Sequence, residues 1–434
     1  MRLILESKIP LEKINYDWIG HIPSDWELKK FKFIFKEKKS TKNLLLCSGS
    51  ISFGEVIYKN DDKITELTKS SYQEVLNGEF LINPLNLNFD LKSLRIGLSK
   101  INVVVSQGYI VLKINKGFCP NYYKYLLRKF DVEYMKSLGQ GVRQTISFND
   151  IKNEYLVVPN FDEQKLISQY LDKKTEKIDL LIEKIEKKIE FLKEKKNSLI
   201  NHYVTKGVNP NIEMKDSGVE LIGNIPKHWK MCKIKYLTTI ITKGTTPSNI
   251  GESFSDNQEV RFIKGEDLID QKVLNKGKTF ISHDVNEKLK RSQLQKDDLL
   301  VVIAGTLGKS AIVVNEILPA NTNQAISLIR FKNKIHSLFT HFYFQSSSFQ
   351  KQVIENAVIA AQPNLSMEDL GNFHLPLPSN EDVEAINNLL EEKSTLITNL
   401  IKKTNQKIIL LKEYRQSLIS SVVTGKIQIT EDML

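Results

Sequence analysis

The chain contains the same unit twice, and this repeat constrains its fold more than any other feature of the sequence. Residues 19–26, Ile-Gly-His-Ile-Pro-Ser-Asp-Trp, return at 222–229 as Ile-Gly-Asn-Ile-Pro-Lys-His-Trp. Residues 147–208 return at 366–427, and 22 of these 62 ungapped positions are identical. We therefore expect two equivalent structural units in tandem, the second with 16 extra residues between its Trp and the longer repeated segment.

A long helix is expected in each copy, because apolar residues recur through the repeated segment in alternating steps of three and four. From Asp162 to Val204 there is no Gly or Pro, and about 43 residues at 1.5 Å each make a rod of roughly 65 Å. Two charged residues, Lys196 and Arg415, interrupt the apolar seam at equivalent positions. The apolar seam positions are Leu171, Ile178, Ile182, Ile185, Ile189, Leu192 and Leu199, and then Leu390, Ile397, Ile401, Ile408, Leu411, Leu418 and Val422.

Two equivalent helices in one chain favour pairing with each other, although a solvated charged rod or a place in a larger bundle remains an alternative. A pseudo-two-fold axis between the copies would make the two helices antiparallel. Pro159 and Pro378 precede the helices, and Gly207 and Gly425 follow them, as expected at helix starts and ends. The sequence therefore predicts an antiparallel intramolecular coiled coil.

Each helix follows a mixed region that has the pattern of an α/β domain. We expect strands at 79–83, 102–114, 299–304, 310–314 and 326–331, and helices at 122–137 and 338–353. The predicted fold class is α+β, with two tandem α/β domains separated by the two long helices. The expected boundaries are a lead-in at 1–23, the first domain at 24–158, the first helical segment at 159–208, a linker at 209–225, the second domain at 226–377, the second helical segment at 378–427 and a tail at 428–434.

Positive charge is concentrated in the two domains. The chain has 62 Lys and Arg against 51 Asp and Glu, a formal charge of +11. Residues 24–158 carry a net +7 and residues 226–378 a net +5, whereas the helical segments 160–206 and 379–425 carry +2 and 0. A basic surplus in the domains favours contacts with nucleic-acid phosphates, and lysines that merely solubilise a large surface are the alternative.

The composition also excludes several classes of protein. Three distant cysteines, Cys47, Cys119 and Cys232, argue against a disulfide framework and for a reducing compartment. No apolar run is long enough to span a membrane, and Glu6 and Lys8 would interrupt the apolar core of a signal peptide. We expect a cytoplasmic protein that makes no membrane contact.

No catalytic apparatus is visible in the sequence. Gly308-Lys309-Ser310 imitates the end of a phosphate-binding loop, but Ile303 stands where that loop needs its first glycine. A β-branched run follows where a helix would have to begin, so we expect a hairpin turn with Gly305 and Gly308 at positive φ. Residues 83–86, Asn-Pro-Leu-Asn, lack the second proline and the aromatic residue of an amino-methyltransferase motif, and the scattered histidines suggest no metal site.

Residues 214–229, MKDSGVELIGNIPKHW, resemble the segment that opens a target-recognition domain in specificity (S) subunits of type I restriction–modification systems. Residues 15–26 resemble the same segment, although Tyr16-Asp17-Trp18 stands where the second copy has Val219-Glu220-Leu221. The helix starts VPNFDEQKLI and PLPSNED and the helix end LKEYRQSLISSVVTGKI are also similar to that family. The resemblance covers essentially the whole chain.

The resemblance implies a non-catalytic DNA-binding subunit of a phage-defence system. Each target-recognition domain would read one half of a bipartite, asymmetric site in double-stranded DNA. The helices would set the spacer between the half-sites and dock adenine methyltransferase (M) subunits, two for each chain, and restriction (R) subunits would join the full complex. S-adenosylmethionine, ATP and Mg²⁺ would belong to those partner subunits, and this chain would bind no cofactor or metal.

Base contacts are expected from polar side chains in loops of the two domains. Arginine can make bidentate contacts to guanine and glutamine to adenine, although a turn or a polar surface position is the commoner role for each of these side chains. The candidates are Gln140, Arg143, Gln144, Ser106 and Gln107 in the first domain, and Lys309, Asn321, Asn323, Gln324 and Gln362 in the second.

The helices would then act as a ruler between two separately read base clusters. One added heptad lengthens a helix by about 10 Å, on the order of three base pairs. A seven-residue insertion within Lys184–Lys196 should therefore lengthen the unread spacer and leave both half-sites unchanged.

Three alternatives to this hypothesis remain. The chain could serve a different modification system, or it could be a coiled-coil adaptor whose two heads bind proteins. It could also be a nucleotide-hydrolysing enzyme that uses Gly308–Ser310. Salt-sensitive, sequence-specific DNA binding would exclude the adaptor, whereas ATP turnover by the isolated chain would favour the enzyme.

Overall fold

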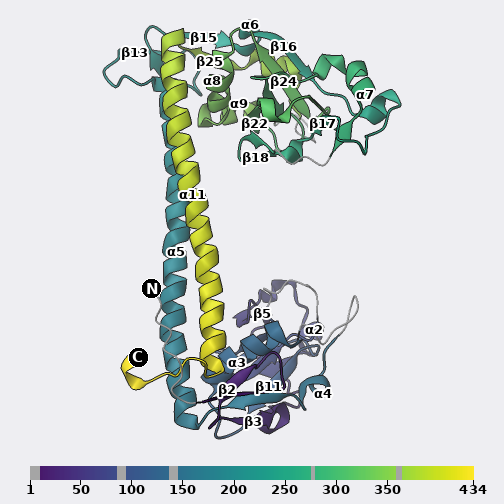
Figure 1. The fold of residues 1–434 in the computed structure, drawn as a ribbon, viewed down its shortest axis with the longest axis vertical. Coiled ribbons are helices and arrows are strands. Elements are labelled where there is room, and N and C mark those ends of the chain that lie inside the picture. Colours follow the sequence, from purple (N-terminus) through teal and green to yellow (C-terminus); the bar gives the residue numbers. More distant parts are fainter. Residues whose placement is uncertain (1–9, 86–93, 136–144, 275–278, 358–363) are drawn as a thin grey trace. The chain divides into compact units, whose positions relative to one another are not determined.

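Two long helices, α5 (Phe161–Lys206) and α11 (Asn380–Val423), are the longest elements of the computed structural model (Figure 1). The structure describes residues 10–85, 94–135, 145–274, 279–357 and 364–434. The chain divides into a first unit of residues 1–185 and 406–434 and a second unit of residues 186–405. Each unit therefore contains one mixed domain, part of α5 and part of α11.

The two helices pair antiparallel in a single register. In the first unit, Arg415 Nη2 of α11 lies 3.0 Å from Asp179 Oδ2 of α5. In the second unit, Lys196 Nζ of α5 donates a hydrogen bond of 3.2 Å to Thr398 Oγ1 of α11. Asp179 and Lys196 are separated along α5 by the same number of residues as their partners Arg415 and Thr398 along α11, and the two partners follow in the opposite order. The predicted antiparallel intramolecular coiled coil is confirmed.

The apolar seam lies inside this pairing. Leu199, Ile401 and Leu411 are partly buried, and the other apolar seam positions are buried. Burial of one Leu or Ile side chain contributes roughly 1.5–3 kcal/mol. The seam therefore stabilises two helices whose remaining faces are mostly charged and would not be stable alone.

The two domains contain the same four-stranded antiparallel sheet. In the first domain its order is β4 (Phe35–Glu37), β11 (Ile110–Ile114), β8 (Phe80–Ile82) and β9 (Ile96–Leu98). In the second domain the order is β16 (Thr238–Lys243), β24 (Ile326–Phe331), β21 (Leu299–Val302) and β22 (Ser310–Ile312). β11 and β24, the second strands in these two orders, each pair with a strand on both sides and are mostly buried, so they lie at the centre of their domains.

Smaller elements complete each domain. The first has the strand pairs β5 (Gly49–Ser52)–β6 (Glu55–Tyr58) and β7 (Gln73–Val75)–β10 (Val103–Val105). Its α-helices are α1 (Phe31–Ile34), α2 (Glu66–Lys69), α3 (Pro120–Glu133) and α4 (Phe148–Ile151). The second has a three-stranded sheet of β20 (Phe280–Ile281), β17 (Val260–Ile263) and β23 (Ala320–Thr322), and the hairpin β18 (Leu268–Ile269)–β19 (Lys272–Val273). Its α-helices are α6 (Ile234–Leu237), α7 (His283–Lys288), α8 (Ile335–Phe344), α9 (Ser347–Ala357) and α10 (Met367–Asn372).

Two expected elements are each divided in two. The strand expected at 102–114 is broken into β10 and β11, because Gln73 Nε2 donates hydrogen bonds to the carbonyls of Ser106 and Tyr109 and so holds a turn between them. The helix expected at 338–353 ends as α8 at Phe344 and restarts as α9, because Ser346 Oγ accepts a hydrogen bond from the amide of Phe349. Side-chain capping of this kind competes with continued secondary structure.

The repeated Trp attaches each domain to the start of its helix. Trp26 Nε1 donates to Glu163 Oε2 at 3.0 Å, and Trp229 Nε1 donates to Asp382 Oδ2 at 2.9 Å. The two carboxylates are the third residues of α5 and α11, where negative charge is favourable. Short strands surround each Trp: β1 (Leu11–Lys13) with β2 (His21–Pro23), β3 (Glu27–Lys30) with β12 (Tyr155–Val158), β13 (Met214–Asp216) with β14 (Asn224–Pro226), and β15 (Lys230–Lys233) with β25 (His374–Leu377).

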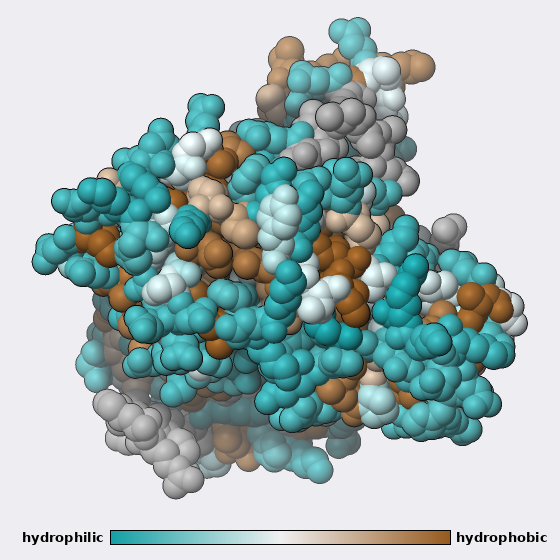
Figure 2. Space-filling view, turned by 90° about the horizontal axis from the view of Figure 1, so that it is seen from above, coloured by the Kyte–Doolittle hydropathy of each residue, from teal (hydrophilic) through white to brown (hydrophobic). Residues whose placement is uncertain are grey.

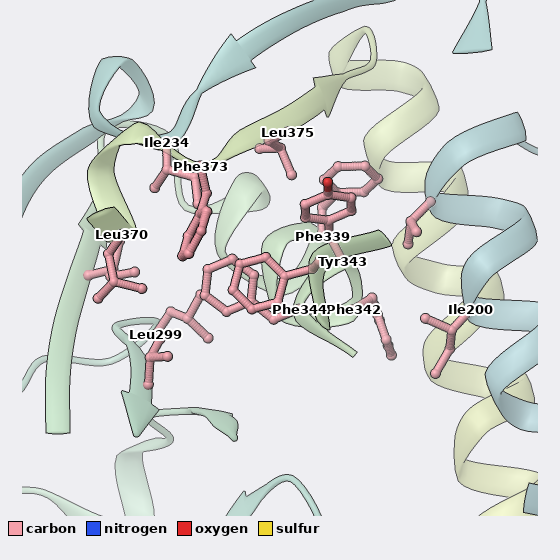
Figure 3. Packing of buried hydrophobic residues seen from close by; sticks show 14 of the residues in the cluster. Ile200, Ile234, Leu299, Phe339, Phe342, Tyr343, Phe344, Leu370, Phe373 and Leu375 are labelled. Atoms are coloured by element: carbon pink, nitrogen blue, oxygen red, sulfur yellow. The ribbon is translucent and has the colours of Figure 1, made fainter. Parts of the chain in front are cut away.

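The core of the second domain continues onto both long helices. Figure 3 shows the aromatic side chains of α8, among them Phe339 and Phe342, between Leu299 of the sheet and Ile200 of α5. Val383, Ile386 and Leu390 of α11 belong to the same buried cluster. The domain and its part of the coiled coil therefore share one hydrophobic core.

Gly425 gives a direct test of how the end of α11 fits the first domain. Its φ is +70°, and a Cβ there would lie 2.3 Å from Pro23 Cδ and 3.0 Å from Trp26 Cη2. Gly425→Ala should therefore lower the free energy of unfolding by about 2–4 kcal/mol, through backbone strain and overpacking together. Thermal unfolding measures the loss.

Gly223→Ala is the matched control. Gly223 has a φ of +69°, but a Cβ added there would meet no described atom within 4 Å. Only the backbone strain of about 1 kcal/mol should remain. Equal destabilisation by the two substitutions would contradict the close packing of Gly425 against Pro23 and Trp26.

Candidate nucleic-acid interface

One end of the four-stranded sheet gathers the exposed polar loops of the second domain. Val302, at the end of β21, pairs with Ile326, at the start of β24, so the turns next to these strands share one edge. The turn at 305–308 and the turn at 323–325 both lie there, and the amide of Ile303 donates to the carbonyl of Ala325. We call these turns the loop edge of the second domain.

The first domain has an equivalent loop edge. Ile82, at the end of β8, pairs with Ile110, at the start of β11, which places the turn at 106–109 beside the segment that follows β8. An isolated bridge joins Leu85 to Thr145, and its counterpart in the second domain joins Ala304 to Asn364. Both bridges connect positions that correspond in the two copies of the repeat, so the two loop edges are built on the same plan.

Several sequence candidates are accessible on these edges. Gln107 is exposed and Ser106 half-buried in the turn between β10 and β11. Lys309 is exposed next to the turn at 305–308, and Gln324 is exposed in the turn at 323–325. The candidates Gln140, Arg143, Gln144 and Gln362 lie outside the described residues.

The side chains of two candidates form hydrogen bonds within the second domain. Asn321 is fully buried: its Nδ2 donates to Asn286 Oδ1 at 2.8 Å and to the carbonyl of Leu289, and its Oδ1 accepts from the amide of Thr322. Asn323 is half-buried, and its Oδ1 accepts a hydrogen bond from the amide of Ala325. A base contact needs an accessible side chain, so the surroundings of Asn321 favour a structural role.

The sequence pattern did not point to the segment after β16, which also reaches this edge. Thr246 Oγ1 donates a hydrogen bond to Gln324 Oε1, and the amide of Thr245 donates to the carbonyl of Thr322. A Cβ at Gly244 would lie 1.9 Å from that same carbonyl, so only glycine fits this approach. The sequence Gly-Thr-Thr-Pro at 244–247 is typical of a turn, and this pattern could have identified the segment as a loop next to the sheet.

The structure shows the conformation of Gly308-Lys309-Ser310, the motif that resembles the end of a phosphate-binding loop. Residues 299–302 and 310–312 form an antiparallel hairpin, and Gly305 and Gly308 have φ of 87° and 77°. The predicted hairpin turn is therefore confirmed.

Among the described residues, no group of three or more His, Cys, Asp or Glu side chains could hold a metal ion. Within the same residues, no helix is long and apolar enough to cross a membrane.

Hydrophilic residues predominate on the face of the molecule drawn in Figure 2, and its apolar residues lie in small separate groups. Such a face is suited to a polar or charged partner rather than to an extended hydrophobic contact. The net charges of +7 and +5 on the two domains make a polyanion the matching partner.

Comparisons with known proteins agree with this arrangement. Residues 23–191 and 226–410 match the family model described as the type I restriction modification DNA specificity domain. The chain is 23% identical over 418 residues to the type I restriction enzyme MjaVIII specificity subunit of Methanocaldococcus jannaschii, covering 94% of both chains. It is 25% identical over 290 residues to the type I restriction enzyme EcoBI specificity subunit of Escherichia coli, covering 65% of this chain and 60% of that protein.

A solved structure supports the fold. It belongs to work on complex assembly and conformational transition of the type I R-M system, and one of its chains matches with a TM-score of 0.69. The match covers 93% of this chain and 99% of that chain, at 13% sequence identity. At this identity the likeness shows a shared fold.

Asn321 in β23 and Gln324 at the loop edge allow a test of which of these amide side chains stabilises the fold. Asn321→Ala should lower the free energy of unfolding by about 2–4 kcal/mol, because several buried hydrogen bonds are lost. Gln324→Ala, three positions further along and exposed, should change stability by no more than about 0.5 kcal/mol. Thermal unfolding of both variants tests this, and unchanged stability with lost DNA binding in Asn321→Ala would contradict the buried role.

Proposed function

The chain belongs to the family of type I restriction–modification DNA specificity domains, and on that premise we propose that it is the specificity subunit of such a system. In this role it is a non-catalytic subunit that binds DNA and assembles with partner subunits. The observation that carries the proposal is the pair of equivalent loop edges, one in each domain, joined by paired helices. Two equivalent reading surfaces on one chain suit a DNA site with two separate halves.

Each domain would combine two kinds of DNA contact. Lysines of the basic domains would contact phosphates, which sets affinity and its salt dependence but carries little sequence information. Side chains of the loop edges would contact base edges, which sets the sequence. Gln107 and Gln324 are accessible for such contacts, and Arg143 is proposed on its chemistry alone.

The two half-sites would differ, because the loop edges differ in sequence. Ser106-Gln107 in the first domain stands where the second has Asn323-Gln324. The connection after β8 extends to Ile96, whereas the connection after β21 is the short turn that ends at Ser310. A bipartite and asymmetric site follows from one fold that carries two sets of loops.

The coiled coil would dock two methyltransferase subunits. Large apolar side chains remain exposed on its outer faces, and the repeat relates two pairs of them: Leu181 with Leu400, and Phe191 with Leu410. Exposed apolar residues at repeat-related positions offer the same contact twice, which suits two copies of one partner. The full set includes Leu180, Leu181, Phe191, Leu396, Leu400, Ile409, Leu410 and Tyr414.

The catalytic chemistry would belong to those partners. S-adenosylmethionine would bind the methyltransferase subunits, and ATP and Mg²⁺ would serve the restriction subunits. The contribution of this chain would be to hold the partners over a chosen DNA sequence. A cytoplasmic location follows from this role, since the DNA and the partner subunits are found there.

A domain exchange tests the proposed function. The chain is co-expressed with the methyltransferase subunit of its own system, and methylated adenines are mapped across the host genome. We expect a bipartite motif, and replacement of residues 24–158 by the first domain of a relative should change one half of it only. The unexchanged half is the internal control. A motif that changes in both halves, or methylation without a bipartite motif, would contradict the proposal.

The helix pairing sharpens the ruler prediction. Because α5 and α11 share one register, an insertion in α5 alone would leave a heptad without a partner. One heptad added after Lys187 together with one added after Gln406 keeps every seam pair. This double insertion should lengthen the unread spacer by about three base pairs, since one heptad adds about 10 Å.

Methylation mapping of the double-insertion variant measures the spacer directly. The single insertion after Lys187 is the matched control. It should lower the free energy of unfolding, because the added heptad of α5 has no partner on α11. A constant spacer with altered half-sites in the double-insertion variant would refute the ruler.

A further inference from the structure

The charged interruptions of the seam occupy equivalent places in the two copies. Lys196 corresponds to Arg415, and their partners on the opposite helix, Thr398 and Asp179, also correspond. The same offset relates both pairs and the longer repeated segment. A cation at a core position weakens a coiled coil compared with Leu or Ile, and burial lowers the pKa of the Lys196 ammonium.

In the second unit, the seam cation also contacts the domain. Lys196 Nζ donates a hydrogen bond of 3.4 Å to Gln271 Oε1, at the tip of the hairpin β18–β19. Asp270 and Gln271 form this tip with φ of 49° and 64°, as both central residues of a type I′ turn require. The hairpin therefore presents a defined tip to the coiled coil.

This polar contact lies apart from the main attachment of the domain. The shared hydrophobic core extends along the two helices as far as Ile200 on α5 and Leu390 on α11. Lys196 is one helical turn beyond Ile200, about 6 Å along the axis, and Thr398 is two turns beyond Leu390, about 12 Å. A domain held by its core can tilt about that attachment, whereas a second contact beyond the edge of the core opposes the tilt.

The first unit shows the same junction in another form. Arg415 pairs with Asp179, and the corresponding hairpin β5–β6 lines the far side of a groove of about 1060 Å³ whose walls include these two residues. Here the domain attaches to α5 through α3 instead: Lys124 Nζ and Tyr125 Oη both donate to Asp172 Oδ1 at 2.7 Å. Among the described residues, a hydrogen bond between hairpin and seam cation is therefore found in the second unit and not in the first.

We propose that Lys196 is a positioning residue that fixes the tilt of the second domain on the coiled coil through the β18–β19 tip. The proposal rests on the DNA-reading function given above. It assigns to Lys196 a part in recognising the distance between the half-sites, although it touches no base. A duplex with the wrong spacing is rejected only as strongly as the domain resists tilting, so a looser domain tolerates more spacings.

The alternative role for Lys196 is to set the register of the helices, as single polar core residues do in other coiled coils. The two roles predict different behaviour for Gln271. A register role involves only the seam, so changes at Gln271 would have no effect. A positioning role requires both residues, so changes at either should act alike.

The test measures binding of the full chain, purified with its methyltransferase subunits, to duplexes with the native spacer and with one base pair more or less. Lys196→Met and Gln271→Asn should each reduce the preference for the native spacer by roughly two- to tenfold, the equivalent of one hydrogen bond. Asn suits the left-handed backbone at position 271 but is too short to reach Lys196. Gln271→Glu should increase the preference, because the hydrogen bond becomes charge-assisted.

Lys193→Met is the matched control, because Lys193 is an exposed lysine of the same helix outside the seam. The Lys193→Met variant should prefer the native spacer as strongly as the unsubstituted chain does. Unchanged preference in Gln271→Asn, with or without an effect of Lys196→Met, would overturn the positioning role. Absence of any bipartite preference in the unsubstituted chain would refute the proposed function itself, so the two failures are distinguishable.

Discussion

The pairing of α5 with α11 is the interaction on which each domain depends. The core of the second domain includes Ile200 of α5 and Leu390 of α11, and in the first unit Tyr122 Oη donates to the carbonyl of Val423 near the end of α11. Each domain therefore completes its packing with the helix that follows it and with the end of the helix from the other copy. Neither half of the sequence supplies all the surfaces that one unit buries, so each unit is completed by residues from both copies of the repeat.

The sequence was sufficient to predict this scaffold because its information is periodic. A heptad seam and a constant offset between the two copies can be read directly from the order of apolar residues, and both correspond to the helices and sheets observed. The breaks at 106–109 and 345–346 could not be predicted in the same way. They depend on single side chains, Gln73 and Ser346, that hydrogen-bond backbone groups and interrupt an otherwise regular pattern.

The candidate interface was predicted less completely, for a related reason. An amide side chain has the same sequence signature whether it contacts solvent or fills a buried hydrogen-bond network, and Asn321 and Gln324 show the two outcomes within one short segment. The contribution of Thr246 becomes visible only when β16 is placed beside β24. Turn residues can be recognised from sequence, but which turns share an edge is decided by strand pairing between distant segments.

The seam cations show how one scaffold can hold two domains differently. The ion pair between Arg415 and Asp179 is partly exposed, with 25% and 50% of the two side chains accessible, and such pairs contribute at most about 1 kcal/mol. A Leu at either position would bury more apolar surface, so the cations lower the stability of the pairing at the two places where it meets the domains. Around Lys196, apolar packing of the coiled coil is thus replaced by polar contacts with the opposite helix and with the hairpin of the second domain. The contact with the hairpin is what the proposed positioning role requires.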